Sequence, residues 1–119
     1  MYIPNPTARL GEKLAAEYLE KQGYKIIERN FRKGWGEIDI IALDDKTLVF
    51  VEVKTKTSNK FGTPFEAMTP FKIKALERTA MFYKKLHPEL PEALRIDAVG
   101  VVLSKDKNAK IDLIKNIYG

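Results

Sequence analysis

The sequence predicts an α/β domain in which helices flank a mixed central β-sheet, in the order α-β-β-β-α-β-β. Three observations carry this prediction. Two stretches begin with a capping residue followed by proline and continue with apolar residues at helical spacing. Five stretches are rich in apolar and β-branched residues, as strands are. The second helical stretch separates two strongly apolar strands, a pattern that favours a right-handed parallel crossover.

The first helix is expected from Pro6 to about Gln22, with Asn5 as its N-cap and Gly23 at its end. Glu12 lies at the edge of the apolar arc of this helix. It is either an ordinary solvated glutamate or a carboxylate that leans over the core toward the strands. Residues 24–31 have strand character with only partial alternation, which predicts an outer strand.

The central strands are expected at residues 36–43 and 48–54, joined by a short polar turn. A second helix is expected to start with Thr69 as its cap and Pro70 at its first position. Two further strands follow, and the last is expected to be an edge strand; their ranges are 95–103 and 110–114.

Three charged residues interrupt the apolar runs of the central hairpin: Asp39, Glu52 and Lys54. An ionised group in an apolar strand is costly unless it is paired or bound to a metal. This conflict between the strand pattern and the charges marks the hairpin as the candidate functional site.

The expected register brings two of these charges together. If the hairpin closes with Leu43 opposite Leu48, Asp39 lies opposite Glu52 on the same face of the sheet. Directly opposed Cβ atoms are roughly 4.5–5.5 Å apart, and two carboxylates that close need a proton or a cation between them. Hard divalent cations take carboxylate oxygens as ligands, so the pair predicts a metal site.

Lys54 lies two residues beyond Glu52 and is expected on the same face, about 6–7 Å along the strand and opposite Glu37. A purely structural interpretation is the alternative. In it, Glu37 and Lys54 form an ion pair, Arg95 and Asp97 form another, and the two opposed acids are a protonated dyad. Asp97 itself either supports the site from further away or simply pairs with Arg95.

A basic loop at residues 55–64 leaves the end of the strand that carries Lys54. Lys56 and Lys60 on this loop, and Lys72 in the first turn of the second helix, are candidate contacts for substrate phosphates. Each is equally well explained as a solvated surface charge. The net charge of +5 and the pI near 9.4 favour a polyanionic partner such as nucleic acid.

Composition excludes several classes of function. The absence of cysteine excludes disulfides, a thiol nucleophile and a cysteine-ligated zinc site. With only one histidine in the chain, no Ser/His/Asp catalytic triad can be identified. The length predicts one domain, residues 1–119. No signal pattern and no apolar run of about 20 residues is found, so we expect a soluble cytoplasmic protein with no membrane partner.

The acidic hairpin resembles a known nuclease signature. Gly36-Glu37-Ile38-Asp39 followed by Val51-Glu52-Val53-Lys54 looks like the PD-(D/E)xK motif of restriction-endonuclease-like nucleases, although the proline of that motif is absent before Asp39. Across nearly the whole chain, the sequence resembles the YraN-like family of small uncharacterised bacterial proteins, itself similar to archaeal Holliday-junction resolvases. The segments that carry this resemblance are the acidic hairpin strands, Gly11-Glu12-Lys13-Leu14-Ala15, Arg29-Asn30-Phe31-Arg32 and Phe61-Gly62.

The resemblance implies a restriction-endonuclease-like fold and metal-dependent hydrolysis of DNA phosphodiester bonds, with branched or structured DNA as the expected substrate. It implies that Asp39 and Glu52 bind Mg²⁺ or Mn²⁺, that Glu12 completes the metal site and that Lys54 is the catalytic lysine. Glu37 belongs to the family motif with a less defined, supporting role. A homodimer is expected by analogy. The alternative is a non-catalytic nucleic-acid-binding module or subunit that retains the nuclease fold.

Overall fold

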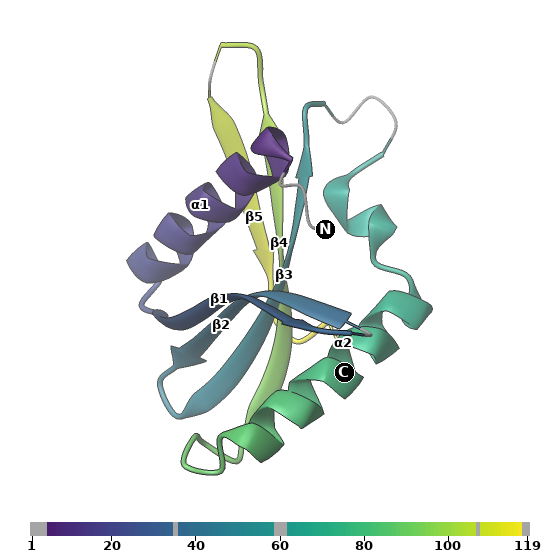
Figure 1. The fold of residues 1–119 in the computed structure, drawn as a ribbon. Coiled ribbons are helices and arrows are strands. Elements are labelled where there is room, and N and C mark those ends of the chain that lie inside the picture. Colours follow the sequence, from purple (N-terminus) through teal and green to yellow (C-terminus); the bar gives the residue numbers. More distant parts are fainter. Residues whose placement is uncertain (1–4, 35, 59–61, 107, 118–119) are drawn as a thin grey trace.

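One five-stranded sheet with a helix on each face forms the body of the protein (Figure 1). The computed structural model describes residues 5–34, 36–58, 62–106 and 108–117. Its elements are α1 (Pro6–Lys21), β1 (Lys25–Lys33), β2 (Gly36–Asp44), β3 (Thr47–Lys56), the 3-10 helix η1 (Pro64–Ala67), α2 (Pro70–Leu86), β4 (Leu94–Leu103) and β5 (Ala109–Ile114). The predicted order is confirmed, and the arrangement is consistent with a restriction-endonuclease-like fold.

The strands lie in the sheet in sequence order, from β1 at one edge to β5 at the other. β3 and β4 are parallel, whereas the other neighbouring pairs are antiparallel. α2 makes the crossover between the two parallel strands, as the sequence predicted. No helix in the described part of the chain is both long enough and apolar enough to cross a membrane.

The two helices begin where the sequence predicts. The Asn5 side chain accepts hydrogen bonds from the backbone N–H groups of Thr7, at 2.9 Å, and Ala8, at 3.4 Å. The Thr69 hydroxyl accepts one from the backbone N–H of Lys72 at 3.2 Å. These caps satisfy backbone donors that the first helical turn leaves without partners. Both helix starts are therefore fixed by local chemistry.

Each helix covers its own hydrophobic core. The α1-side core consists of Ala15, Ala16, Leu19, Tyr24, Ile40, Ala42, Val49, Val51, Val53, Val99 and Val101. The α2-side core consists of Ile38, Ile41, Leu48, Phe50, Leu76, Ala80, Tyr83 and Ile96. The helical spacing places Leu10 on the apolar arc of α1, but Leu10 is exposed in the structure, so the predicted arc is only partly right. Glu12, at the edge of the arc, is buried, as the second of its two interpretations has it. α1 therefore turns a carboxylate toward the sheet.

Gly11 lets α1 approach β3 closely, since a Cβ at this position would collide with the side chain of Thr55. We expect Gly11→Ala to destabilise the protein by about 1–3 kcal/mol, as overpacking does. In an open helix the same change would stabilise by about 1 kcal/mol. Urea unfolding measures the sign. Gly34→Ala, where a Cβ meets no atom within 4 Å, is the matched control. A stabilised Gly11→Ala variant would refute the close packing.

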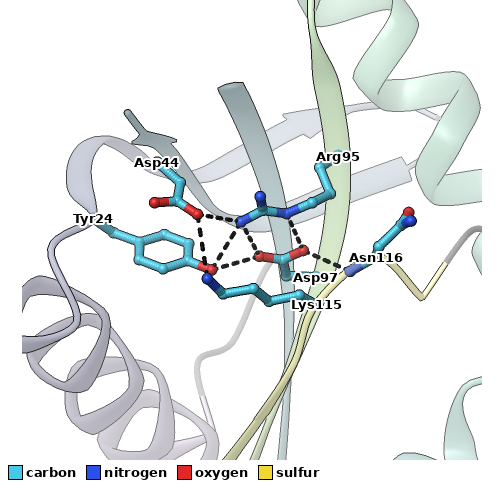
Figure 2. Close-up of polar contacts among 6 residues, drawn as sticks. All are labelled: Tyr24, Asp44, Arg95, Asp97, Lys115 and Asn116. Carbon is cyan, nitrogen blue, oxygen red and sulfur yellow. Dashed lines mark hydrogen bonds and ion pairs between the residues drawn. The ribbon is translucent and has the colours of Figure 1, made fainter. Parts of the chain in front are cut away.

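A partly buried polar network joins Tyr24, the residue before β1, to β2, β4 and the segment after β5 (Figure 2). At its centre, Asp97 is fully buried and accepts hydrogen bonds from the Tyr24 hydroxyl at 2.7 Å and from Arg95 Nε at 2.9 Å. The backbone N–H of Asn116 donates to the same carboxylate at 2.9 Å. Arg95 also bonds Asp44 at 2.6 Å. The structural interpretation of Asp97, as the ion-pair partner of Arg95, is confirmed.

Candidate functional site

The acidic site begins where the regular pairing between β2 and β3 stops. The predicted closing pair of the hairpin, Leu43 opposite Leu48, is confirmed. The regular ladder ends at Ile40, the residue next to Asp39. Beyond that point the Asp39 carboxylate accepts a hydrogen bond from the backbone N–H of Val53 at 2.7 Å. A side chain therefore connects the two strands where their backbones no longer pair.

The side-chain alternation of β2 breaks at the same place. Ile38 packs in the α2-side core and Ile40 in the α1-side core, although a regular strand would place both on one face. The expected placement of Asp39 directly opposite Glu52 assumed unbroken alternation, and that assumption is wrong here. The acids meet through an irregular part of the sheet.

Three carboxylates converge at this irregularity. One ligand oxygen each from Glu12, Glu37 and Asp39 can be chosen so that all lie within 4.8 Å of one another. Glu12 comes from α1, and the other two come from β2. Only 8% of Glu12 and 5% of Asp39 is exposed. This acidic cluster could hold a metal ion, because oxygen-only donor sets suit hard divalent cations.

The composition of the cluster differs from the predicted ligand set. Glu12 and Asp39 come together as expected, but the third member is Glu37, which the sequence suggested only as a supporting residue. Glu52 lies beside the cluster and shares a hydrogen bond with Asp39. Lys54 Nζ is 3.8 Å from Glu52 Oε1. Glu52 thus connects the acidic cluster to the lysine.

Burial and mutual repulsion raise the pKa values of these acids. Burial raises the pKa of Asp39 well above its ordinary value, and the charge of Glu52 raises it further. Burial also raises the pKa of Glu12, with Glu37 adding to the shift and Arg29 opposing it. The pKa of Glu52 is raised by burial, against the hydrogen bond from Asp39 and the charge of Lys54. The cluster therefore favours a bound proton or cation.

This shift predicts how the stability of the metal-free protein depends on pH. Because the pKa of Asp39 is higher in the folded than in the unfolded protein, the folded state binds more protons between those two values. The free energy of unfolding should therefore fall as pH rises through this window, by about 1.4 kcal/mol for each unit of pKa difference. Asp39→Asn should flatten the decline, because its amide does not titrate, while its oxygen can still accept the hydrogen bond from Val53. Urea unfolding in a chelator between pH 5 and 8 measures this, and identical pH profiles would contradict it.

A cavity of about 680 Å³ lies on the α1 side of the acidic cluster. We call it the basic cavity, because four of its lining residues are cationic; the lining consists of Arg9, Leu10, Glu12, Lys13, Arg29, Asn30 and Arg32. Arg32 also forms an ion pair with Glu37 at 3.2 Å. No role in substrate binding was expected for these residues. The alignment of Arg32 with Glu37 on the neighbouring strands β1 and β2 is the signal that points to this cavity.

A second hollow, of about 220 Å³, lies at the start of α2. We call it the α2 hollow; it is lined by Gly36, Glu37, Glu52, Lys54, Phe71, Lys72, Ala75 and Leu76. The acidic cluster connects the two spaces, because Glu12 lines the basic cavity and Glu37 lines the α2 hollow.

Of the three lysines predicted to contact substrate phosphates, Lys56, Lys60 and Lys72, the two that the structure describes do not lie together in one site. Lys72 lines the α2 hollow, near enough to Glu52 for its charge to oppose the rise in the pKa of that acid. Lys56 Nζ donates a hydrogen bond to the backbone oxygen of Gly62 at 3.3 Å. Lys60 lies outside the described residues.

Comparison with known proteins gives consistent matches over most of the chain. The model of the uncharacterised protein family UPF0102 matches residues 11–101. A UPF0102 protein of Syntrophomonas wolfei is 45% identical over 108 residues, which cover 91% of this chain and 93% of the relative. One from Geobacter metallireducens is 47% identical, covering 91% of this chain and 88% of the relative. A third, from Syntrophus aciditrophicus, is 44% identical and covers 94% and 87%.

Proposed function

This chain belongs to the uncharacterised protein family UPF0102, and from that premise we propose that it is a metal-dependent endonuclease that hydrolyses phosphodiester bonds in DNA. The observation that carries the proposal is the buried convergence of Glu12, Glu37 and Asp39, with Glu52 and Lys54 beside it. Buried like charges are costly without a counter-ion, so a purely structural role explains this arrangement poorly.

In the proposed site, Glu12, Glu37 and Asp39 hold Mg²⁺ or Mn²⁺, and Glu52 lies at its margin. A bound divalent cation polarises a phosphoryl oxygen and lowers the pKa of bound water. The all-carboxylate donor set fits such an ion. The hydrogen bond from the backbone N–H of Val53 holds the Asp39 carboxylate in place, so this metal ligand is positioned in the metal-free protein.

Lys54 supplies the positive charge beside the acids. Glu52 holds its ammonium group at 3.8 Å, on the side of the cluster that opens into the α2 hollow. A cation held there would stabilise the negative charge that develops on the phosphate, or position the attacking water. The lysine thus acts on the reacting group, and Glu52 orients the lysine.

The basic cavity supplies the proposed contacts to the DNA backbone. Arg9, Lys13 and Arg29 border the cavity that Glu12 also lines, so a strand that follows these cations passes the acidic cluster. Binding through phosphate contacts predicts affinity that falls steeply with salt and varies little with base sequence. Branched or structured DNA is the proposed substrate.

We also propose where the protein acts in the cell and how its chains assemble. The proposed location is the cytoplasm, where the chain would meet bacterial DNA. The proposed assembly is a homodimer, which would present one acidic cluster to each of two strands. Sedimentation of the purified protein measures the assembly directly.

The proposal is tested by incubating branched, flapped and linear DNA with the protein and Mg²⁺ or Mn²⁺. We expect cleavage that requires metal and falls about 10²- to 10³-fold in Lys54→Ala, the loss typical when a group that stabilises transition-state charge is removed. Lys110→Ala, on the exposed part of β5, is the matched control and should cleave normally. Cleavage that persists in Lys54→Ala would point to a contaminating nuclease. Metal binding without any cleavage would instead favour the non-catalytic DNA-binding module.

A further inference from the structure

Phe71 stands out among the apolar side chains of α2. It is 82% exposed, more than any other large apolar residue in the described ranges. The α2-side core takes its helical residues from Leu76, Ala80 and Tyr83, and Phe71 is not among them. Its ring therefore adds little to the stability of the fold.

The position of Phe71 sets it apart from an ordinary surface residue, because single exposed apolar side chains are common. Phe71 borders the α2 hollow together with Glu52 and Lys54. The adjacent Lys72 lines the same hollow. A flat apolar ring and two ammonium groups thus share one small space at the edge of the acidic cluster.

We propose that Phe71 stacks on an unpaired base of the DNA next to the cleavage site, so that the preferred substrate is DNA with unpaired nucleotides. This inference rests on the proposed function, because it takes the acidic cluster as the point of cleavage. An aromatic ring stacks on any base through its π-face. Bases within a duplex are already stacked on their neighbours, so the ring can engage only a base that is unpaired or flipped out.

The lysines complete the nucleotide site. Lys72 and Lys54 lie where they can bind the phosphates on either side of the stacked base, an arrangement that recurs in proteins that bind single strands. The backbone of Phe71 is fixed, because the residue follows Pro70 in the first turn of a helix capped by Thr69. A fixed backbone keeps the ring at the edge of the α2 hollow, so less conformational freedom is lost when a base stacks on it.

The experiment measures binding without metal, so that it does not depend on cleavage. A labelled duplex with a short unpaired bulge and a fully paired duplex of equal length are titrated with the protein in EDTA, by fluorescence anisotropy. We expect the wild-type protein to prefer the bulged DNA. Phe71→Ala should weaken binding to the bulged DNA about 5- to 100-fold and leave binding to the paired duplex almost unchanged. Phe71→Tyr should restore the preference.

Two controls separate stacking from other effects. Met81→Ala removes another exposed apolar residue of α2, 51% exposed, and should not change the preference. Lys72→Ala should weaken binding to both DNAs and reduce the salt dependence, whereas Phe71→Ala should leave the salt dependence intact. With 2-aminopurine at the unpaired position, wild type and Phe71→Tyr should quench its fluorescence and Phe71→Ala should not.

The inference is overturned if the wild-type protein binds both DNAs equally, or if Phe71→Ala weakens both equally. Unchanged quenching in Phe71→Ala would overturn it as well. Failure of this inference alone leaves metal-dependent cleavage intact. Failure of the proposed function appears separately, as absent cleavage with Mg²⁺ or Mn²⁺ while the EDTA binding preference persists. Absence of all DNA binding would overturn both.

Discussion

Asp39→Asn is expected to reduce metal-dependent cleavage of DNA by about 10³-fold or more, equivalent to about 4 kcal/mol of transition-state stabilisation. Asp39 is the central acid of the site, because it joins the acidic cluster, shares a hydrogen bond with Glu52 and accepts one from Val53. An amide at this position keeps the bond from Val53 but removes the negative charge that a cation requires.

The same variant should gain stability without metal. It removes a buried carboxylate whose raised pKa makes ionisation costly, so the metal-free variant should melt a few degrees higher near pH 8. Adding Mg²⁺ or Mn²⁺ should raise the melting temperature of the wild type but not of the variant. Asp112→Asn, on the exposed part of β5, is the matched control. An Asp39→Asn protein that cleaves at the wild-type rate would exclude Asp39 from the metal site.

Asp97→Ala is expected to destabilise the protein by about 3–5 kcal/mol, the usual cost of removing one partner of a buried ion pair. Asp97 is fully buried, and its loss would remove one of the two carboxylates that Arg95 bonds and leave the Tyr24 hydroxyl without its acceptor. The loss is a large part of the stability of an ordinary domain, which is about 5–15 kcal/mol. Urea unfolding measures it.

The matched control for this prediction is Asp112→Ala, which removes an exposed carboxylate from the neighbouring strand β5. It should change stability by less than about 0.5 kcal/mol. If Asp97→Ala unfolds at the same urea concentration as the control, then the network contributes little to stability. Cleavage by a folded Asp97 variant should be normal, because none of the partners of Asp97 belongs to the acidic cluster.

Local chemistry explains why most of the fold could be predicted from the sequence. The caps Asn5 and Thr69 act within one helical turn, and their interactions depend on neighbours close in the chain. The apolar strands, and the helix between two of them, leave few topologies once a right-handed crossover is required. The pairing of Leu43 with Leu48 follows from the short turn between them.

The parts of the site that could not be predicted depend on irregular geometry and on packing between distant elements. The predicted partner of Asp39 was counted from the turn on the assumption that β2 and β3 pair regularly throughout. This regular pairing ends at Ile40, the residue next to Asp39. The depth of Glu12 depends on how closely Gly11 lets α1 approach Thr55, and helical periodicity contains no information about that.

The third member of the acidic cluster was not predicted as a ligand. Glu37 lies two residues before Asp39 on the same strand, but the sequence favoured Glu52, on the neighbouring strand, as the partner of Asp39. In the structure Glu37 belongs to the cluster and Glu52 lies beside it. The basic cavity was also missed, because its cations come from both α1 and β1. Its assembly depends on tertiary packing.

If Glu12, Glu37 and Asp39 bind a divalent cation, calorimetric titration of the purified protein with Mn²⁺ should show one ion bound per chain, with protons released as the ion displaces them from the acids. Glu37→Gln should bind Mn²⁺ at least about tenfold more weakly, and Glu66→Gln, on η1, should bind it normally. The acidic cluster is not a metal site if the wild-type protein binds no Mn²⁺ at millimolar concentration, or if the Glu37→Gln and Asp39→Asn variants bind it as tightly as the wild type.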